Sequence, residues 1–288
     1  MLYSTKADLI NDLKGIVNIQ KGGTIKIIDK DTFRNKKIDT LIYNAVFNKE
    51  AAIKNISRWL IRSTSNKLGI ISSSIQSLYE AIGEKQFQGF TVPAINIRGL
   101  TYDVARSIFR AAKKNHVGAF IFEIARSEIG YTDQRPVEYV SATLAAAIKE
   151  GHEGPVFIQG DHFQINAKKY EKDKDAELNT VRNLIKEAIE AGFYNIDIDT
   201  STLVDLNKPD LTEQQRLNFE FAAELTAYIR SLEPKRINIS VGGEIGEVGK
   251  KNSTVEELKA FMDGYNKTLV AKGKGLNGIS KISVQTGT

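Results

Sequence analysis

Asp161 and His162 are the adjacent residues of this chain best suited to chemistry. They follow a short apolar run, Val156–Gln159, which Pro155 and Gly160 bound and which therefore predicts a buried strand. In parallel α/β folds, ligands and catalytic groups collect at the carboxyl ends of the strands. A carboxylate there can move protons, and an imidazole can move protons or bind a metal. The pair predicts a functional site at the exit of this strand.

Further carboxylates belong to two other predicted strands. Glu244 follows Arg236–Val241, and with His162 it could supply two ligands of a zinc site. Asp197 and Asp199 alternate along one strand and so point to the same face. Two buried carboxylates need partners, which a metal, substrate hydroxyls or helix N-termini could provide. The simpler alternative is that Asp199 only caps the turn that follows.

Glycines are dense around Glu244, at positions 242, 243, 246 and 249. They permit tight turns and leave backbone groups free to face a small ligand. Their spacing matches neither the P-loop nor the dinucleotide-binding pattern. Ordinary loop glycines are an equally good interpretation of them.

A regular succession of predicted strands and helices must position these residues. Helical patterns separate six β-rich runs: Thr91–Ile97, Gly118–Ile124, Val156–Gln159, Tyr194–Asp199, Arg236–Val241 and Lys281–Gln285. The βα alternation favours a parallel sheet, because parallel strands need crossover connections. Polar residues follow several strands and no dinucleotide fingerprint follows the first, so we predict an α/β protein with a (β/α)8 TIM barrel. About six strands make this barrel incomplete, and we expect a truncation at the C-terminus.

Local signals mark the helix ends. The spacing of a capping box occurs twice, at Thr212 with Gln215 and at Ser253 with Glu256. Pro136 fits the first turn of the helix that follows the second strand. Gly192 fits the end of the helix that follows the third.

The first 83 residues differ in pattern from the rest. They contain one predicted strand, Thr24–Ile28, and predicted helices at Ala51–Ser63 and Ser72–Gly83. We therefore predict a mostly helical N-terminal extension, residues 1–83, and a partial barrel domain, residues 84–288. The sequence shows no functional motif in the extension.

Composition excludes several classes of function. The chain has 288 residues and no cysteine, so disulfides, thiolate nucleophiles and cysteine-ligated metals are excluded. The net charge of +5 comes with both signs interspersed along the helices, so we expect no nucleic-acid partner. The N-terminus lacks the apolar stretch of a signal peptide, and runs such as Leu144–Ile148 are too short to span a bilayer. We expect a cytoplasmic protein with no membrane partner.

Five segments of residues 90–288 resemble, in order, the class II, metal-dependent fructose-bisphosphate aldolase family. They are Val92–Ile97, Gly154–His162, Ala191–Ser201, Gly243–Gly249 and Val284–Thr288. The second resembles the strand that ends in the family's His-x-Asp-His motif. The fourth resembles its Glu-(Leu/Ile)-Gly-x-x-Gly loop.

The resemblance implies a lyase of glycolysis or related carbohydrate metabolism. Such an aldolase cleaves a ketose 1,6-bisphosphate, fructose 1,6-bisphosphate or a close epimer, to dihydroxyacetone phosphate and an aldehyde. The resemblance makes His162 and Glu244 ligands of zinc or another divalent metal. It makes Asp161 the catalytic residue that handles the proton on the hydroxyl next to the breaking bond, which is general acid–base work.

The same resemblance implies how the phosphorylated sugar is bound. Asn96, Asp199 and Ser201 would contact the substrate. Gly246 and Gly249 would belong to a loop that holds a monovalent cation, Na⁺ or K⁺, near the phosphate. We also expect a homo-oligomer.

The sequence departs from the family at three places. At the exit of the second strand, Ala125 stands where the family usually has a serine. Gln159 stands where the family has the first histidine of its motif, and Lys250-Lys251-Asn252 stand where acidic residues are common. Two further zinc histidines would lie beyond Thr288, so residues 1–288 alone are expected to be inactive. These departures leave the second proton transfer and the stereochemistry of the sugar open.

Two other functions compete with a metal aldolase. A Schiff-base aldolase would need an active lysine. Lys281 opens its predicted strand, about 13 Å below the exit at roughly 3.3 Å per residue, which is too deep. The other alternative is a non-catalytic sugar-phosphate-binding or accessory subunit on the same barrel, which the lysines after Gly249 favour and Asp161, His162 and Glu244 oppose.

Overall fold

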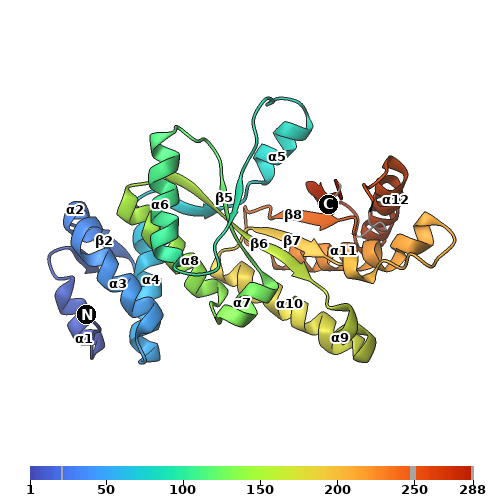
Figure 1. Cartoon of the computed structure of the whole chain (residues 1–288). Coiled ribbons are helices and arrows are strands. Elements are labelled where there is room, and N and C mark those ends of the chain that lie inside the picture. Colours follow the sequence, from blue (N-terminus) through green and yellow to red (C-terminus); the bar gives the residue numbers. More distant parts are fainter. Residues whose placement is uncertain (21, 247–250, 287–288) are drawn as a thin grey trace. The chain divides into compact units, whose positions relative to one another are not determined.

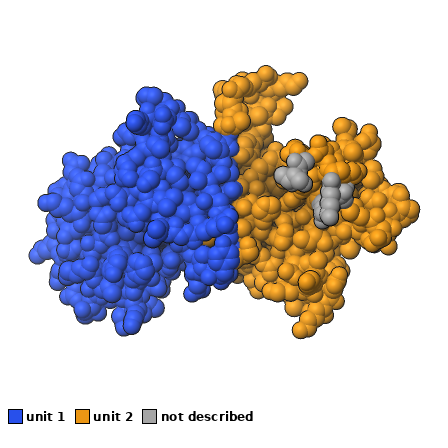
Figure 2. Space-filling view, in the orientation of Figure 1, with its two compact units in different colours: residues 1–73, 92–123, 128–158 blue, residues 74–91, 124–127, 159–288 orange. Residues whose placement is uncertain are grey.

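The computed structural model describes residues 1–20, 22–246 and 251–286, and it divides into two compact units (Figures 1 and 2). Unit 1 comprises residues 1–73, 92–123 and 128–158. Unit 2 comprises residues 74–91, 124–127 and 159–288. Each unit is thus assembled from separate stretches of chain. The predicted division of the sequence at residue 83 stays a prediction.

Unit 1 begins with a largely helical region. Its helices are α1 (Lys6–Asp12), α2 (Lys30–Thr32), the π-helical η1 (Phe33–Lys37), α3 (Ile38–Phe47) and α4 (Ala51–Lys67). Its strands are the antiparallel pair β1 (Val17–Ile19) and β2 (Ile25–Ile27), followed by β3 (Ile70–Ser73). A mostly helical N-terminal region was predicted, and this is what the structure contains.

Helix α8 (Pro136–Glu150) is the centre of unit 1. Its sequence is rich in alanine, and an unbroken stretch from Tyr139 to Ile148 is buried. Small side chains let α3, α4 and α6 (Thr101–Lys114) all pack against it, which explains why it is apolar on every side. Pro136 occupies the first turn, as predicted.

Unit 2 contains the elements that carry most of the candidate chemistry. Its helices are α5 (Gln76–Gly83), α9 (Ala167–Lys172), α10 (Lys174–Ala191), the short η2 (Ser201–Leu203), α11 (Leu211–Leu232) and α12 (Val255–Lys272). Helices α11 and α12 pack closely because Gly264 leaves room for the ring of Phe219, with which any Cβ there would collide. Gly192 ends α10 with φ +111°, as predicted.

Six strands match the six predicted runs: β4 (Ala94–Asn96), β5 (Ile121–Ala125), β6 (Gly154–Gln164), β7 (Asn195–Asp199), β8 (Ser240–Glu244) and β9 (Lys281–Ser283). Within unit 1, β4 pairs with β5, and β3 pairs with the first residues of β6. Within unit 2, the last residues of β6 pair with β7, β7 with β8, and β8 with β9. All these pairings are parallel, so the predicted α/β class is confirmed, and the strands are consistent with an incomplete (β/α)8 barrel.

Several predicted boundaries were wrong. Strand β6 runs to Gln164, so Asp161 and His162 lie within it rather than after it. Strand β8 starts and ends later than predicted, so Glu244 is its last residue. Strand β9 stops at Ser283, two residues before the predicted end. The segment predicted to start a helix at Ser72 is the end of strand β3.

Both predicted capping boxes were misplaced. Asp210, not Thr212, caps α11 and accepts a hydrogen bond from the backbone N–H of Glu213. The box of α12 lies one residue later than predicted, with Thr254 and Glu257 bonded reciprocally. Ser253 instead accepts a hydrogen bond at its hydroxyl from the backbone N–H of Gln285.

The described residues contain no helix that could cross a membrane. None of their helices combines the length and the apolar character needed to cross a bilayer.

Candidate functional site

A β-bulge in β6 presents Asp161 and His162. Gly160 pairs with Ile196, and Phe163 pairs with Ile198. Between these two pairs β6 contains two residues and β7 contains one, which defines the bulge. The bulge places His162 at φ +42°, a left-handed conformation that a non-glycine residue rarely adopts. It also folds the ring of Phe163 over Gly160, where a Cβ would lie 2.5 Å from the ring. Bulges of this kind re-aim side chains beside active sites.

His162 meets two carboxylates from the neighbouring strands. Its Nδ1 lies 3.2 Å from Oδ2 of Asp199, at the end of β7, and 3.2 Å from Oε2 of Glu244, at the end of β8. Its Nε2 lies 3.5 Å from Oδ1 of Asp161. Asp199 is buried, whereas the side chain of His162 is 49% exposed, so the cluster opens to solvent at the imidazole. The structure therefore brings together three residues predicted from three separate strands.

The carboxylates raise the pKa of His162. Hydrogen bonds with Asp199 and Glu244 are the main cause, burial opposes them, and the charges of Asp161 and Glu244 add to them. Together they raise the pKa to about 11, so without a metal the imidazole is a cation at neutral pH. Burial raises the pKa of Asp199, but the hydrogen bonds from His162, Ser201 and Gln164 lower it by more. The net pKa of Asp199 is therefore below its usual value.

Asp199 is held on both of its oxygens. The backbone N–H and the hydroxyl of Ser201 donate to Oδ1, at 3.0 and 2.6 Å. The amide of Gln164 donates to Oδ2 at 2.5 Å. Asp199 does cap the turn that follows, which was the simpler alternative, and it also reaches His162. The two interpretations were not exclusive.

Two buried amides on α11 hold the exits of β7 and β8. The sequence pattern had not singled out Asn218, and it had indicated Gln215 only as part of a capping box. Asn218 donates from Nδ2 to the backbone oxygen of Glu244 at 2.9 Å and accepts at Oδ1 from the hydroxyl of Thr200 at 2.6 Å. Gln215 donates to the backbone oxygen of Ile245 at 2.9 Å. Buried polar residues inside an amphipathic helix were the available signal.

Ser201, predicted to contact the substrate, and Gly246, predicted to belong to the cation-binding loop, lie against each other. Gly246 has φ +87°, and a Cβ there would lie 2.8 Å from Cβ of Ser201. A glycine is therefore required by both its conformation and its surroundings. Gly249, the other predicted glycine of this loop, lies outside the described residues.

Asn96 is the last residue of β4 in unit 1, and its side chain forms hydrogen bonds with an acidic and a basic residue. Its Nδ2 donates to Glu128 at 2.7 Å, and its Oδ1 accepts from Arg98 at 3.3 Å. Arg98 also pairs with Glu128 at 2.7 Å and is 67% exposed. The amide is thus already oriented by neighbours, and its contact with substrate stays a prediction.

Lys281 is much nearer to a strand end than predicted. Since β9 stops at Ser283, the lysine lies two residues, about 7 Å, below the exit rather than about 13 Å. Its Nζ lies 2.8 Å from Oδ1 of Asp197 and donates to Oε1 of Gln159 at 2.5 Å. The ring of Tyr79, on α5, lies 5.6 Å from the same nitrogen. This ion pair was missed because Lys281 and Asp197 belong to strands that are not adjacent.

Lys251 has a structural partner. Its Nζ lies 2.8 Å from Oε1 of Glu257, the buried glutamate of the α12 capping box. The ammonium lowers the pKa of Glu257, against the effect of burial. Lys250 lies outside the described residues.

The cluster fits a divalent metal. One nitrogen of His162 and one oxygen each of Asp199 and Glu244 lie within 4.8 Å of one another. Imidazole and carboxylate groups are ligands that zinc and similar divalent ions accept. The pairs around Asp199 supply the outer hydrogen bonds that orient metal ligands.

Comparison with protein families decides the relationship. The model of the family described as fructose-bisphosphate aldolase class-II matches residues 76–273. The chain belongs to this family. The matched residues include the candidate cluster, so the resemblance carried by the Asp-His and Glu-Ile-Gly segments is confirmed for the class II aldolase family.

A looser likeness exists to a solved structure. It is described as "Crystal structure of a probable tagatose 6 phosphate kinase from Sinorhizobium meliloti 1021", with 15% sequence identity and a TM-score of 0.49. The match covers 64% of this chain and 46% of that one, so this aldolase-family chain spans about half the length of that structure. A search of curated proteins finds no match.

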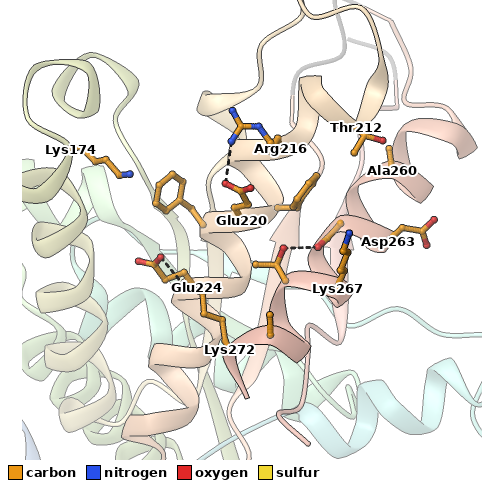
Figure 3. A pocket seen from close by; sticks show the side chains of 14 residues that line it. Lys174, Thr212, Arg216, Glu220, Glu224, Ala260, Asp263, Lys267 and Lys272 are labelled. Atoms are coloured by element: carbon orange, nitrogen blue, oxygen red, sulfur yellow. Dashed lines mark hydrogen bonds and ion pairs between the residues drawn. The ribbon is translucent and has the colours of Figure 1, made fainter. Parts of the chain in front are cut away.

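A groove along α11 and α12 is unrelated to the cluster. Its volume is about 660 Å³, and Figure 3 shows the charged side chains that line it, among them Arg216, Glu220, Glu224 and Lys272. Arg216 lies 3.6 Å from Glu220, and Lys272 lies 3.3 Å from Glu224. These two ion pairs neutralise part of the charge that lines the groove. None of the predicted site residues lines it.

Proposed function

We propose that this class II aldolase family member is a metal-dependent lyase of sugar bisphosphates. It would cleave a ketose 1,6-bisphosphate, such as fructose 1,6-bisphosphate or a close epimer, to dihydroxyacetone phosphate and an aldehyde. The observation that carries the proposal is the convergence of His162, Asp199 and Glu244 within 4.8 Å, with Asp161 beside them. Membership of the family supports the reaction class.

The metal would be held by His162 and Glu244, with Asp199 as a third donor. Zinc is the ion we expect, and another divalent ion would suit the same donors. A bound divalent ion supplies a Lewis acid that stabilises the negative charge developing at the substrate carbonyl. The full reaction is proposed for the whole protein.

Asp161 would accept the proton from the hydroxyl next to the breaking bond and return it in the condensation direction. Its side chain is 19% exposed and lies at the rim of the cluster, where a substrate hydroxyl can reach it. The bulge in β6 holds Asp161 and His162 as a pair, so proton transfer and metal binding occur next to each other.

Ser201 would border the substrate, and Asn96 is also proposed as a substrate contact. The loop that begins at Gly246 would hold a monovalent cation, Na⁺ or K⁺, near a phosphate. We further propose a cytoplasmic homo-oligomer acting in glycolysis or a related sugar pathway.

A non-catalytic sugar-phosphate-binding subunit is the second candidate. Lys251 favours it, because this residue neutralises the buried Glu257 rather than offering the acidic group common in the family. Such a subunit would retain the barrel and the binding groups without turning substrate over.

Two variants of the full protein separate these functions. Asp161→Ala should abolish cleavage of fructose 1,6-bisphosphate while the protein still binds its metal, and His162→Ala should lose both. His116→Ala, at an exposed loop position, is the control and should change neither. Cleavage is followed by coupled detection of dihydroxyacetone phosphate, and bound metal by elemental mass spectrometry.

Normal turnover by Asp161→Ala would contradict the assignment of the proton-handling residue. A metal-loaded wild-type protein that binds the bisphosphate without cleaving it would support the accessory subunit instead.

A further inference from the structure

Lys281 is joined to the strands that carry the candidate metal ligands, although it is not itself a ligand. We propose that Gln159, Asp197 and Lys281 form a lysine clamp that positions His162, Asp199 and Glu244. This inference rests on the proposed metal site and names residues that set its geometry.

The clamp spans four strands, with three positions at one level of the sheet and Gln159 two residues lower, opposite Asn195. Asp197 on β7, Gly242 on β8 and Lys281 on β9 lie side by side in register. The lysine reaches across β8 to Asp197, at 2.8 Å, and further to Gln159 on β6, at 2.5 Å. The three strands that it touches or crosses, β6, β7 and β8, are those that carry the metal ligands.

Gly242 makes the contact across β8 possible. A Cβ at this position would collide with Oδ1 of Asp197 and lie 2.9 Å from Cε of Lys281. The ion pair therefore occupies the space that a side chain on the middle strand would fill. Gly242 does not have a positive φ, so this packing, rather than backbone conformation, is its constraint.

The metal ligands lie one level above the clamp. Asp199 follows Asp197 by two residues on the same face of β7, and Glu244 follows Gly242 by two residues on β8. Along a strand this separation is about 7 Å. A change in the spacing of β7 and β8 at the clamp is therefore transmitted directly to the two carboxylates.

The charges of the clamp depend on one another. Oδ1 of Asp197 is buried and faces the ammonium of Lys281 without a hydrogen bond of good geometry. Removing the lysine alone would leave this half-buried carboxylate without its ionic partner, which is costly. Gln159 has a defined role here, because its carbonyl oxygen accepts from Lys281 where the family commonly has a histidine.

The test measures Zn²⁺ affinity of the metal-free full protein by competition with a chromophoric chelator. Lys281→Met keeps the length of the side chain and removes the ammonium, and we expect Zn²⁺ binding weakened about 10-fold or more. Lys259→Met is the matched control, because Lys259 pairs with Asp263 at 3.1 Å on the exposed face of α12. Gly242→Ala should act like Lys281→Met, whereas Gly243→Ala, next to it, should not.

The double variant Asp197→Asn/Lys281→Met removes both charges and keeps the test valid if the single variant folds poorly. Its Zn²⁺ affinity should stay low, because the clamp is absent. Recovery of wild-type affinity would overturn the inference, since the loss would then come only from the unpaired Asp197. Wild-type affinity in a folded Lys281→Met protein, or failure of both variants to fold, would also overturn it. If the wild-type protein binds no Zn²⁺, the proposed function fails as well.

Discussion

Asn218 offers the sharpest test of how the fold sets the site. This fully buried amide connects the exits of β7 and β8. We consider Asn218→Leu, which keeps the branched shape of the side chain and removes its polar atoms. Two of its partners retain another bond: the backbone oxygen of Ile245 accepts from Gln215, and Thr200 still donates to the backbone oxygen of Asn218. The net loss falls on the backbone oxygen of Glu244 and on Oε1 of Gln215.

At about 0.5–1.5 kcal/mol for each hydrogen bond, the two losses lower the free energy of unfolding by about 1–3 kcal/mol. Urea denaturation followed by circular dichroism measures this change. Asn179→Leu, on the exposed face of α10, is the control and should stay within about 0.5 kcal/mol of the wild type. Because Asn218 anchors the backbone of Glu244, its variant should also bind Zn²⁺ more weakly. If Asn218→Leu unfolds at the same urea concentration as the control, the two exits are not held by this amide and the reasoning is refuted.

Two other predictions concern conformation and pH. Gly246→Ala should destabilise the protein by about 1 kcal/mol or more, because φ +87° and the contact with Ser201 both oppose a Cβ. The control is Gly83→Ala, at a helical glycine with open space around it, which should be neutral or stabilising. Equal thermal unfolding midpoints for the two variants would contradict this prediction. For Glu177, burial raises the pKa, but Arg126 at 2.6 Å and the backbone N–H of Asn166 lower it further, so the folded value is depressed. The contribution of Glu177 to stability is therefore present above its ordinary pKa of 4.5 and is lost as the pH falls through the lower folded pKa. In urea titrations at a series of pH values, the free energy of unfolding of Glu177→Gln should fall less steeply at acid pH than that of the wild type. If the variant and the wild type lose stability equally as the pH falls, the ion pair of Glu177 with Arg126 does not contribute to the free energy of unfolding.

Strand positions were predictable from the sequence because the apolar runs are short and well separated by helical patterns. Strand ends were not. Val241 is followed by two glycines, which carry no hydropathy signal, so the continuation of β8 to Glu244 depends on pairing with β7 and β9. The helix start at α12 failed for a similar reason, because Ser253 and Thr254 are each followed three residues later by a glutamate. Only the local geometry selects Thr254.

The candidate site was partly predictable for a physical reason. Asp199 and Glu244 end their strands, and Asp161 and His162 lie at a bulge near the end of β6, where a parallel sheet collects polar residues. The clamp residue Lys281 and the amide Asn218 act through partners far away in the sequence, and no spacing rule connects them. The bulge was also hidden, since a single extra residue between Gly160 and Phe163 leaves the pattern of residue types unchanged.

The bulge in β6 has a consequence for the evolution of the protein. Deleting one residue between Gly160 and Phe163 would restore regular pairing with β7 and remove the strained backbone at His162. Selection for heat resistance alone would therefore favour shorter descendants in which the sheet is improved and the histidine is lost or turned away. Selection for the reaction would keep the length of this segment fixed. Loop lengths can change freely in such a lineage, whereas an insertion or deletion in these four residues would disrupt the bulge.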